Sequence, residues 1–569
     1  MHSSHKWKCS LPVILGCSLT LLGACSDPGT VDGQASGAAM QPDPQAMSVV
    51  SCSELAGLRI AASDIGLPTT GATINSAELI AGTAEASGNG DYCKVLGAIH
   101  PLDYTAPDIN FQVNLPANWN GKSVQFGGGG LNGTLGTGLG PYVKQPAGEA
   151  TPLARGYLTL GSDSGHRSAG GFDGTFFLNE EALMNFGHMQ IKKTHDVAMW
   201  LSQRHYGEEP RYNYFMGGSQ GGHEGFDAMQ RFPDDYDGVV AGYPAHNVVL
   251  LHLSALNYAR ALAADDGAGW MNPQQIAFFT GEVYARCDAL DAAEDGIISN
   301  VADCLEATSE FRLDSEANPL RCAQGNAAGD ACLSSAQIRM LNALDTPFDA
   351  GFSIYAHDIG SSSFPKWTPF EGSTFMDGGN SNLGASGPDA ALQRAPGVAT
   401  NGLAIAQDLS LDVMADFDAR EHAARIIEVA SKLSANSVNL DRFRDKGGKL
   451  IFFHGSVDDY IPVYSSIEYY ERLLARYGED EAERFVRFYT IPGMGHVTGV
   501  FSARLASLDA HEAWVERGEA PGELVAFDAN TATAGRTRPV CLYPAWPRYS
   551  GAGDMNSADS FDCVLSSGD

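Results

Sequence analysis

A serine flanked by glycines is the first feature of this 569-residue chain that could do chemistry. Ser219 lies in the run Gly217-Gly218-Ser219-Gln220-Gly221-Gly222, after an apolar, β-rich stretch (212–216) and before a helix-compatible stretch (223–231). Small residues on both sides suit a strained strand-to-helix turn that presents a nucleophilic hydroxyl. A glycine-rich turn with a capping serine is the alternative, but the two flanking elements favour the nucleophile.

A serine hydroxyl needs a base to take its proton, and the base needs a carboxylate to orient it. Asp458 follows the predicted strand 449–453, and His496 follows the predicted strand 485–491. The chain order Ser219, Asp458, His496 is that of α/β-hydrolases. Asp459 is an alternative acid with a less suitable spacing from its strand. Alternative bases, none of which has the required position after a strand, are His166, His223 and His454.

Attack on a carbonyl creates an oxyanion that two backbone amides must stabilise. One donor should be Gln220, the residue after the nucleophile. The second should come from an earlier loop, and the glycine run 127–130 directly follows the predicted strand 123–126. We expect Gly128 to be that donor, because glycine lets the backbone approach the substrate closely, although a simple tight turn is the alternative.

Strands and helices alternate in two separated regions of the sequence. The first has predicted strands at 123–126, 157–160, 212–216 and 238–241 with a helix at 184–206, and the second has strands at 449–453 and 485–491 with a helix at 465–477. This pattern predicts an α/β-hydrolase fold with a mostly parallel sheet. We expect the core to comprise 51–245 and 436–569, and the irregular stretch 246–435 to be a large inserted lid domain.

The N-terminus has the layout of an export signal. Lys6 and Lys8 precede an apolar stretch (11–22) that is too short to span a membrane. The stretch ends in Leu22-Gly23-Ala24-Cys25, which resembles a bacterial lipobox, so we expect residues 1–25 to be a lipoprotein-type signal peptide with Cys25 lipidated. Cleavage after a small residue without lipidation is the alternative. The polar segment 26–50 then predicts a flexible tether.

Charge and cysteine content narrow the possible partners. The chain has 36 basic and 68 acidic residues, and its net charge of -32 repels phosphate backbones, which excludes a nucleic-acid partner. Eight cysteines follow Cys25, and an even number in an exported chain indicates four disulfides, with 105 possible pairings. Zinc-type spacing is absent from the sequence, which disfavours metal binding by these cysteines.

Acidic residues gather between Cys287 and Ile297 in the predicted insertion. Carboxylates at such short spacing suit calcium, which prefers several oxygen ligands. A solvated acidic loop explains the same spacing nearly as well.

The chain resembles the tannase and feruloyl esterase family, which includes bacterial mono(2-hydroxyethyl) terephthalate hydrolases. The resemblance extends in order over nearly everything from Cys52 to Cys563. The matching segments are 118–121, 217–225, 231–233, 236–238, 287–297, 443–449, 492–496 and 514–521.

This resemblance implies a Ser219, Asp458 and His496 triad with Gly128 and Gln220 as oxyanion hole. It implies a structural Ca²⁺ in the lid, with ligands Asp288, Asp291, Asp295 and the carbonyls of Ala293 and Ile297. It also implies disulfides Cys52–Cys93, Cys287–Cys304, Cys322–Cys332 and Cys541–Cys563.

Two positions depart from the family pattern. Members commonly have cysteines immediately before the nucleophile and after the base, forming a disulfide between the two loops, whereas this chain has Gly218 and Val497. We therefore expect the triad geometry to rest on packing alone. In the lid, Arg394 lies in a segment resembling the one in terephthalate monoester hydrolases whose arginine binds the substrate carboxylate, although Val398 stands where an aromatic residue would be expected.

The resemblance implies a serine esterase that cleaves small aromatic acid esters, such as feruloyl, galloyl or terephthalate monoesters, through an acyl-enzyme. Together with the N-terminal signal, it leads us to expect an exported protein, and we expect a monomer. Its expected location is the outer membrane, the periplasm or the medium. The alternative is a non-catalytic surface lipoprotein with the same fold that binds aromatic or carbohydrate ligands. An intact triad argues against that alternative, because binding alone requires no nucleophile.

Overall fold

A ten-stranded sheet forms the centre of the protein, with the strand order β1-β2-β3-β4-β6-β5-β7-β8-β11-β12. The computed structural model describes residues 49–82, 88–168, 173–323, 329–355, 362–373, 397 and 400–566. The strands are β1 (Arg59–Ile60), β2 (Gly71–Ile80), β3 (Tyr92–His100), β4 (Ile109–Pro116), β5 (Lys122–Phe126), β6 (Leu158–Ser162), β7 (Tyr212–Gly218), β8 (Gly238–Gly242), β11 (Lys449–Gly455) and β12 (Val486–Ile491).

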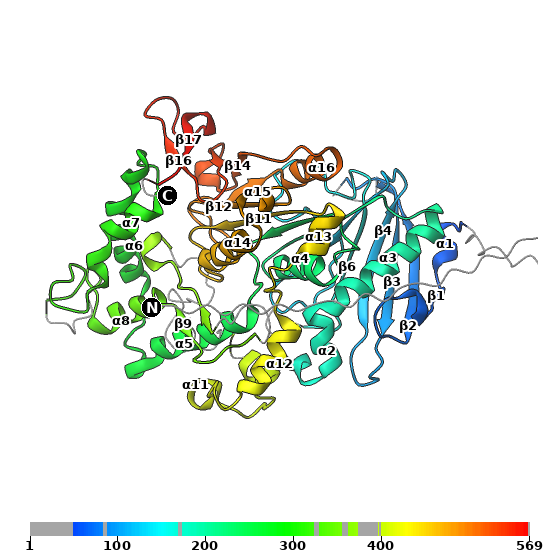
Figure 1. The fold of residues 1–569 in the computed structure, drawn as a ribbon, viewed down its shortest axis with the longest axis horizontal. Coiled ribbons are helices and arrows are strands. Elements are labelled where there is room, and N and C mark those ends of the chain that lie inside the picture. The colour runs from blue at the N-terminus through cyan, green and yellow to red at the C-terminus, as the bar shows by residue number, and fades with distance from the viewer. Residues whose placement is uncertain are drawn as a thin grey trace, which may run out of the picture. The chain divides into compact units, whose positions relative to one another are not determined.

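The six strands from β6 to β12 pair in parallel, and the strands from β1 to β4 pair antiparallel with their neighbours. Figure 1 shows the antiparallel strands, in blue, at one end of the sheet and the green helices of the insertion beyond the other. A mostly parallel sheet flanked by helices is the α/β-hydrolase fold, as predicted. The antiparallel part of the sheet was not predicted, because buried polar residues such as Gln112 and Asn114 interrupt the apolar pattern of β4.

Alternate residues of the parallel strands point to opposite faces of the sheet and pack into two separate cores. On β7, Tyr214 belongs to the core that contains Trp514 of α16 (Ser507–Arg517). Its neighbour Phe215 belongs to the core that contains Phe226 of α4 (Gln220–Arg231). Both faces are therefore buried, which explains why these strands appear as continuous apolar runs in the sequence.

The remaining helices fall into two groups. Those outside the long connection from β8 to β11 include α1 (Cys52–Leu55), α2 (Glu180–Met184), α3 (Gln190–Tyr206), α14 (Val463–Tyr477) and α15 (Glu479–Ala482). That connection contains α5 (Val248–Gly267), α6 (Pro273–Cys287), α7 (Val301–Ala307), α8 (Ser335–Leu344), α11 (Val413–Asp416), α12 (Ala423–Leu433) and α13 (Asp441–Lys446), with the short strands β9 (Phe348–Asp349) and β10 (Ser363–Phe364).

The connection from β8 to β11 contributes most residues of a large apolar cluster. That cluster also contains Phe177 and Phe186, which precede α3, and Ile461, which follows β11. The insertion thus packs directly on the core of the fold, and residues 47–569 group as one compact unit. None of the helices in the described ranges is long and apolar enough to cross a membrane.

Small sheets complete the C-terminal region. A three-stranded sheet consists of β13 (Ala503–Leu505), β14 (Leu524–Asp528) and β15 (Thr537–Val540), and β16 (Trp546–Tyr549) pairs with β17 (Phe561–Val564).

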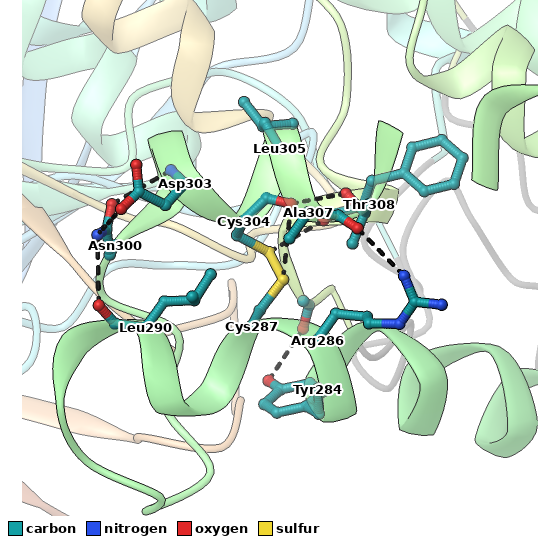
Figure 2. The surroundings of a disulfide bond; sticks show 12 residues. Tyr284, Arg286, Cys287, Leu290, Asn300, Asp303, Cys304, Leu305, Ala307 and Thr308 are labelled. Atoms are coloured by element: carbon teal, nitrogen blue, oxygen red, sulfur yellow. Dashed lines mark hydrogen bonds between the residues drawn. A yellow bond between two sulfur atoms is a disulfide. The ribbon is translucent and has the colours of Figure 1, made fainter. Parts of the chain in front are cut away.

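Four disulfides form, and all four predicted pairings are confirmed: Cys52–Cys93, Cys287–Cys304, Cys322–Cys332 and Cys541–Cys563. Figure 2 shows the second of them, which joins the end of α6 to α7. Beside it, Asn300 caps α7 by accepting from the amide of Asp303, and its side chain also donates to the Leu290 carbonyl. The disulfide and this cap hold the two ends of the acidic loop together.

Candidate active site

Ser219 occupies a sharp turn between β7 and α4. Its backbone φ of 59° and ψ of -120° lie in a region that residues with side chains rarely adopt. Close backbone contacts explain the glycines around it: a Cβ on Gly217 would lie 2.5 Å from the Gly221 backbone, and one on Gly222 would lie 2.6 Å from the Gly242 carbonyl oxygen. The turn therefore has the strained geometry that the sequence pattern predicted.

Three side chains from separate loops meet at this turn. The Nε2 atom of His496 lies 2.9 Å from Ser219 Oγ, and its Nδ1 atom lies 2.8 Å from Asp458 Oδ2. Asp458 follows β11 and His496 follows β12, at the carboxyl ends of adjacent parallel strands. These contacts assign Nδ1 as the protonated nitrogen, which leaves Nε2 to accept from the serine hydroxyl.

Asp458 is fully buried and stays ionised. Burial opposes its ionisation, but attraction to His496 and hydrogen bonds with His454 and His496 outweigh that cost and hold its pKa well below the usual range. Its Oδ1 accepts from the backbone amides of Tyr460 and Ile461. The carboxylate is thus held by its own loop in the orientation that His496 requires.

The alternative residues have structural contacts instead. His454 makes hydrogen bonds with the Ser466 hydroxyl and the Ile461 carbonyl, His223 pairs with Asp227, and His166 contacts the Leu131 carbonyl. Each of the three is buried. The structure therefore brings only His496 of the candidate bases into hydrogen-bond contact with Ser219 among the residues described.

The expected oxyanion role of Gly128 stays a prediction, and the amide of this residue has a competing partner in the structure. Its amide donates to Glu224 Oε2 at 2.9 Å, so the N–H that would stabilise an oxyanion already has a carboxylate partner. Glu224 also accepts from the side chains of Asn132 and Gln190, at 2.5 and 3.2 Å. Of this glycine run it is Gly130 that lines the cavity at Ser219.

Glu224 is a functional candidate that sequence reasoning missed. It is 1% exposed, and burial raises its pKa to about 7, against the effect of its hydrogen bonds from Gly128 and Asn132. The signal in the sequence was an acid one helical turn into α4, on the buried face of the helix that starts at the nucleophile.

A cavity of about 200 Å³ opens at Ser219. Its lining is mostly apolar and comes from both the core and the insertion: Gly130, Leu131, Ser219, Gln220, Ala245, Val248, Leu251, His252, Tyr460, Ile461, His496 and Val497. His252 is a polar group in this wall; burial lowers its pKa to about 4, so its imidazole is neutral, and Nδ1 makes a 2.7 Å hydrogen bond with the Thr400 hydroxyl. The mostly apolar lining suits an apolar group of the ligand.

The predicted calcium loop contains Asp288, Asp291 and Asp295 at short spacing. In the part of the chain that the structure describes, however, the carboxylate oxygens of these three residues do not all lie within 4.8 Å of one another. Burial raises the pKa of Asp288 and raises that of Asp291 to about 6, and repulsion from Asp295 adds to both shifts. Asp295 pairs with Arg538. Within the described ranges, the three acidic or imidazole side chains whose ligand atoms lie within 4.8 Å of one another are His195, Asp196 and Asp235, where Lys192 already supplies a positive charge.

The donor types in this loop, carboxylates and backbone carbonyls, fit calcium, and a cation would stabilise the ionised forms of buried Asp291 and half-buried Asp288, whose pKa values are raised. The predicted substrate-binding Arg394 and the predicted lipidation site Cys25 lie outside the described residues.

Comparisons with known proteins agree with this geometry. The sequence profile described as tannase and feruloyl esterase matches residues 93–564. An uncharacterised esterase of Agrobacterium fabrum is 39% identical, covering 90% of this chain and 93% of its own. Mono(2-hydroxyethyl) terephthalate hydrolase of Piscinibacter sakaiensis is 30% identical, covering 85% and 86%. The crystal structure of feruloyl esterase B from Aspergillus oryzae has the same fold, with a TM-score of 0.70 at 24% identity over 88% of this chain and 98% of that one.

Proposed function

Because the chain belongs to the tannase and feruloyl esterase family of carboxylic ester hydrolases, we propose that it cleaves esters of aromatic acids through an acyl-enzyme on Ser219. The observation that carries this proposal is the unbroken series of hydrogen bonds from Ser219 through His496 to Asp458, at a strained turn that faces a cavity. A protein that only binds a ligand has no need for this arrangement.

The first half of the reaction forms the acyl-enzyme. His496 takes the proton of Ser219 through Nε2 as Oγ attacks the ester carbonyl, and Asp458 stabilises the imidazolium that results. The proton then passes from His496 to the departing alcohol. In the second half, His496 removes a proton from water, the resulting hydroxide attacks the acyl carbon, and the proton returns to Ser219 as the acid leaves.

The oxyanion in both halves needs two amide donors. Gln220 is the first residue of α4, where backbone amides have no partner within the helix and the helix dipole favours negative charge. We assign the second donor to Gly130, because it lines the cavity at Ser219 whereas the Gly128 amide is bound to Glu224.

The Ser219→Ala variant tests the proposal. The wild type is expected to release p-nitrophenol from a p-nitrophenyl ester in a burst equal to the enzyme concentration, and Ser219→Ala is expected to show neither burst nor turnover above a few parts in a thousand. Equal behaviour of the two proteins would instead support the non-catalytic binding protein.

The substrate class is assigned from the cavity and the relatives. An apolar wall that includes the neutral imidazole of His252 suits the ring of an aromatic acid. The relatives include a mono(2-hydroxyethyl) terephthalate hydrolase and a probable feruloyl esterase of Arthroderma benhamiae. We assign Arg394 the role of binding a free carboxylate on such a ring, since a guanidinium binds a carboxylate with two parallel hydrogen bonds. Arg394→Ala should then raise KM for a terephthalate monoester about tenfold or more and leave KM for methyl ferulate within twofold. Equal effects on both esters would remove this role.

Location and calcium complete the proposal. The charged and apolar N-terminal segment supports export, and its Cys25 supports lipid attachment to the outer membrane. Disulfides agree with an oxidising compartment. The acidic loop 288–297 would hold a structural Ca²⁺ through Asp288, Asp291, Asp295 and two carbonyls, and the ion takes no part in ester cleavage. In this role it would neutralise the repulsion that Asp295 exerts on Asp288 and Asp291.

A further inference from the structure

A buried lysine binds the backbone of the loop that carries His496. Lys144 lies in the connection between β5 and β6 and is 6% exposed. Its ammonium group donates to the backbone carbonyl of His496 at 3.3 Å and reaches that of Val497 at 3.5 Å. Its own carbonyl accepts from the amide of Leu505 at 2.8 Å, so its backbone is anchored to the segment that follows the catalytic loop.

An aromatic ring joins the lysine to the imidazole. The Lys144 ammonium lies over the ring of Tyr243, 5.3 Å from its centre, and that ring meets the His496 imidazole edge-on with 4.7 Å between centres. Tyr460 stacks on the imidazole at 4.8 Å. The backbone of Tyr243 is anchored as well, since its amide donates to the Phe453 carbonyl of β11 at 2.7 Å. The rings of Tyr243 and Tyr460 thus contact the His496 imidazole, and the Lys144 ammonium group binds the His496 backbone.

The same tyrosine covers the residue before the nucleophile. A Cβ on Gly218 would lie 2.8 Å from the Tyr243 hydroxyl and 2.8 Å from Val143 Cγ2. Tyr243 therefore occupies the space into which a side chain at position 218 would extend. This arrangement corrects the expectation that packing alone holds the triad, because charge-assisted hydrogen bonds and a cation–π contact also connect the two catalytic loops.

We infer that Lys144 and Tyr243 act together as positioning residues, forming a noncovalent clamp that keeps the His496 imidazole within hydrogen-bond distance of Ser219. The inference rests on the proposed function, because it assigns the clamp a role in the proton transfer between these two residues. It predicts an effect on the rate of the chemical step and little effect on substrate binding, since neither side chain lines the cavity as the structure describes it.

Lys144→Met tests the clamp, because methionine keeps the length of the side chain and removes the charge and the donors. We expect kcat for a p-nitrophenyl ester to fall about tenfold or more, with KM within twofold. Lys144→Arg, which keeps the charge and the donors, should recover most of the loss. Lys449→Met is the matched control, because Lys449 also makes a cation–π contact, with Trp514, at the opposite end of β11, and we expect its kcat to stay within twofold.

The two partners should act as one unit. Tyr243→Phe keeps the ring and should change kcat by less than threefold, whereas Tyr243→Leu should lower kcat about as much as Lys144→Met. The double variant Lys144→Met, Tyr243→Leu should be little slower than either single variant, since the second change removes a contact that is already lost. Fully multiplicative losses would overturn the idea of a shared clamp.

A covalent label separates this inference from the proposed function. Fluorophosphonate labelling of Ser219 needs a positioned imidazole but no ester turnover. We expect Lys144→Met to slow labelling about as much as it slows turnover, at a melting temperature within a few degrees of the wild type. Unchanged labelling, or a loss that follows the melting temperature alone, would overturn the clamp. If the wild type is labelled but cleaves no aromatic ester, and Lys144→Met is labelled more slowly than the wild type, the proposed function is refuted and the clamp is supported.

Discussion

Replacing Glu224 by glutamine should lower the rate of ester cleavage without unfolding the protein. Its two carboxylate oxygens accept three N–H groups, one from the Gly128 backbone and two from the side chains of Asn132 and Gln190. A glutamine has one acceptor oxygen and one NH₂ group. In either orientation of the glutamine amide, its NH₂ group faces at least one of these three N–H donors, and that donor must move away.

The size of the effect follows from those contacts. If the glutamine oxygen keeps Asn132 and Gln190, the Gly128 amide loses its partner and is repelled by the new NH₂. Leaving a buried backbone N–H without a partner costs about 1–3 kcal/mol. Because Gly130 lies two residues further along the same loop, we expect part of this displacement to reach the oxyanion donor. A loss of about 1.4–2.8 kcal/mol in transition-state stabilisation corresponds to a fall in kcat of roughly 10- to 100-fold.

The assay compares kcat, KM and melting temperature for Glu224→Gln with those of a matched control, Asp227→Asn. Asp227 is a buried acid on the same helix that pairs with His223 and Arg231 and makes no contact with the glycine loop among the bonds described. We expect Glu224→Gln to lower kcat with KM nearly unchanged, and Asp227→Asn to lower mainly the melting temperature. If the two variants lose stability alike and both keep kcat, the glycine loop does not depend on Glu224.

Two further predictions concern stability. Burial lowers the pKa of His246 to about 3 and that of His252 and His511 to about 4, so between about pH 6.5 and 4 the unfolded chain binds protons that the folded chain does not. These histidines should make the free energy of unfolding fall as the pH falls through this window, whereas the raised pKa values of Glu224 and Asp291 act in the opposite direction. Comparing urea titrations of the wild type and His511→Gln isolates one histidine: the variant should lose less stability than the wild type between about pH 6.5 and 4, and parallel profiles of the two proteins would contradict this. Removing calcium with EDTA should lower the melting temperature by several degrees, and Asp291→Asn should abolish that response without changing kcat; identical melting with and without Ca²⁺ would argue against the site.

The strands that carry the three candidate catalytic residues were predictable because their local sequence pattern specifies them. The strands that carry Ser219, Asp458 and His496 were expected within two residues of their observed ends, since strands buried on both faces form continuous apolar runs that end at glycine-rich loops. The antiparallel strands β2 to β4 were not expected, because their buried faces contain polar residues that are satisfied only in the assembled sheet. Asn114, for example, donates to the Thr159 hydroxyl of β6.

The supporting residues were harder to predict because each acts across a large sequence separation. Nothing near Lys144 in the sequence indicates that its side chain meets carbonyl groups 352 residues away. The choice between Gly128 and Gly130 as oxyanion donor has a similar difficulty: four consecutive glycines are equivalent in sequence, and only the position of Glu224 in the folded protein distinguishes them. Pattern reasoning thus located the three side chains that meet at Ser219, while the contacts that orient them required the structure.

The order of the catalytic residues along the chain also has a consequence during biosynthesis. The serine precedes its imidazole by 277 residues, and the strand that delivers the carboxylate must join the edge of β8 after the whole insertion has been made. A chain that is still emerging from the ribosome has the Ser219 hydroxyl but lacks the imidazole that contacts it in the folded protein. The proposed ester cleavage therefore has to wait until the last strands dock, a form of latency that needs no propeptide and no inhibitor.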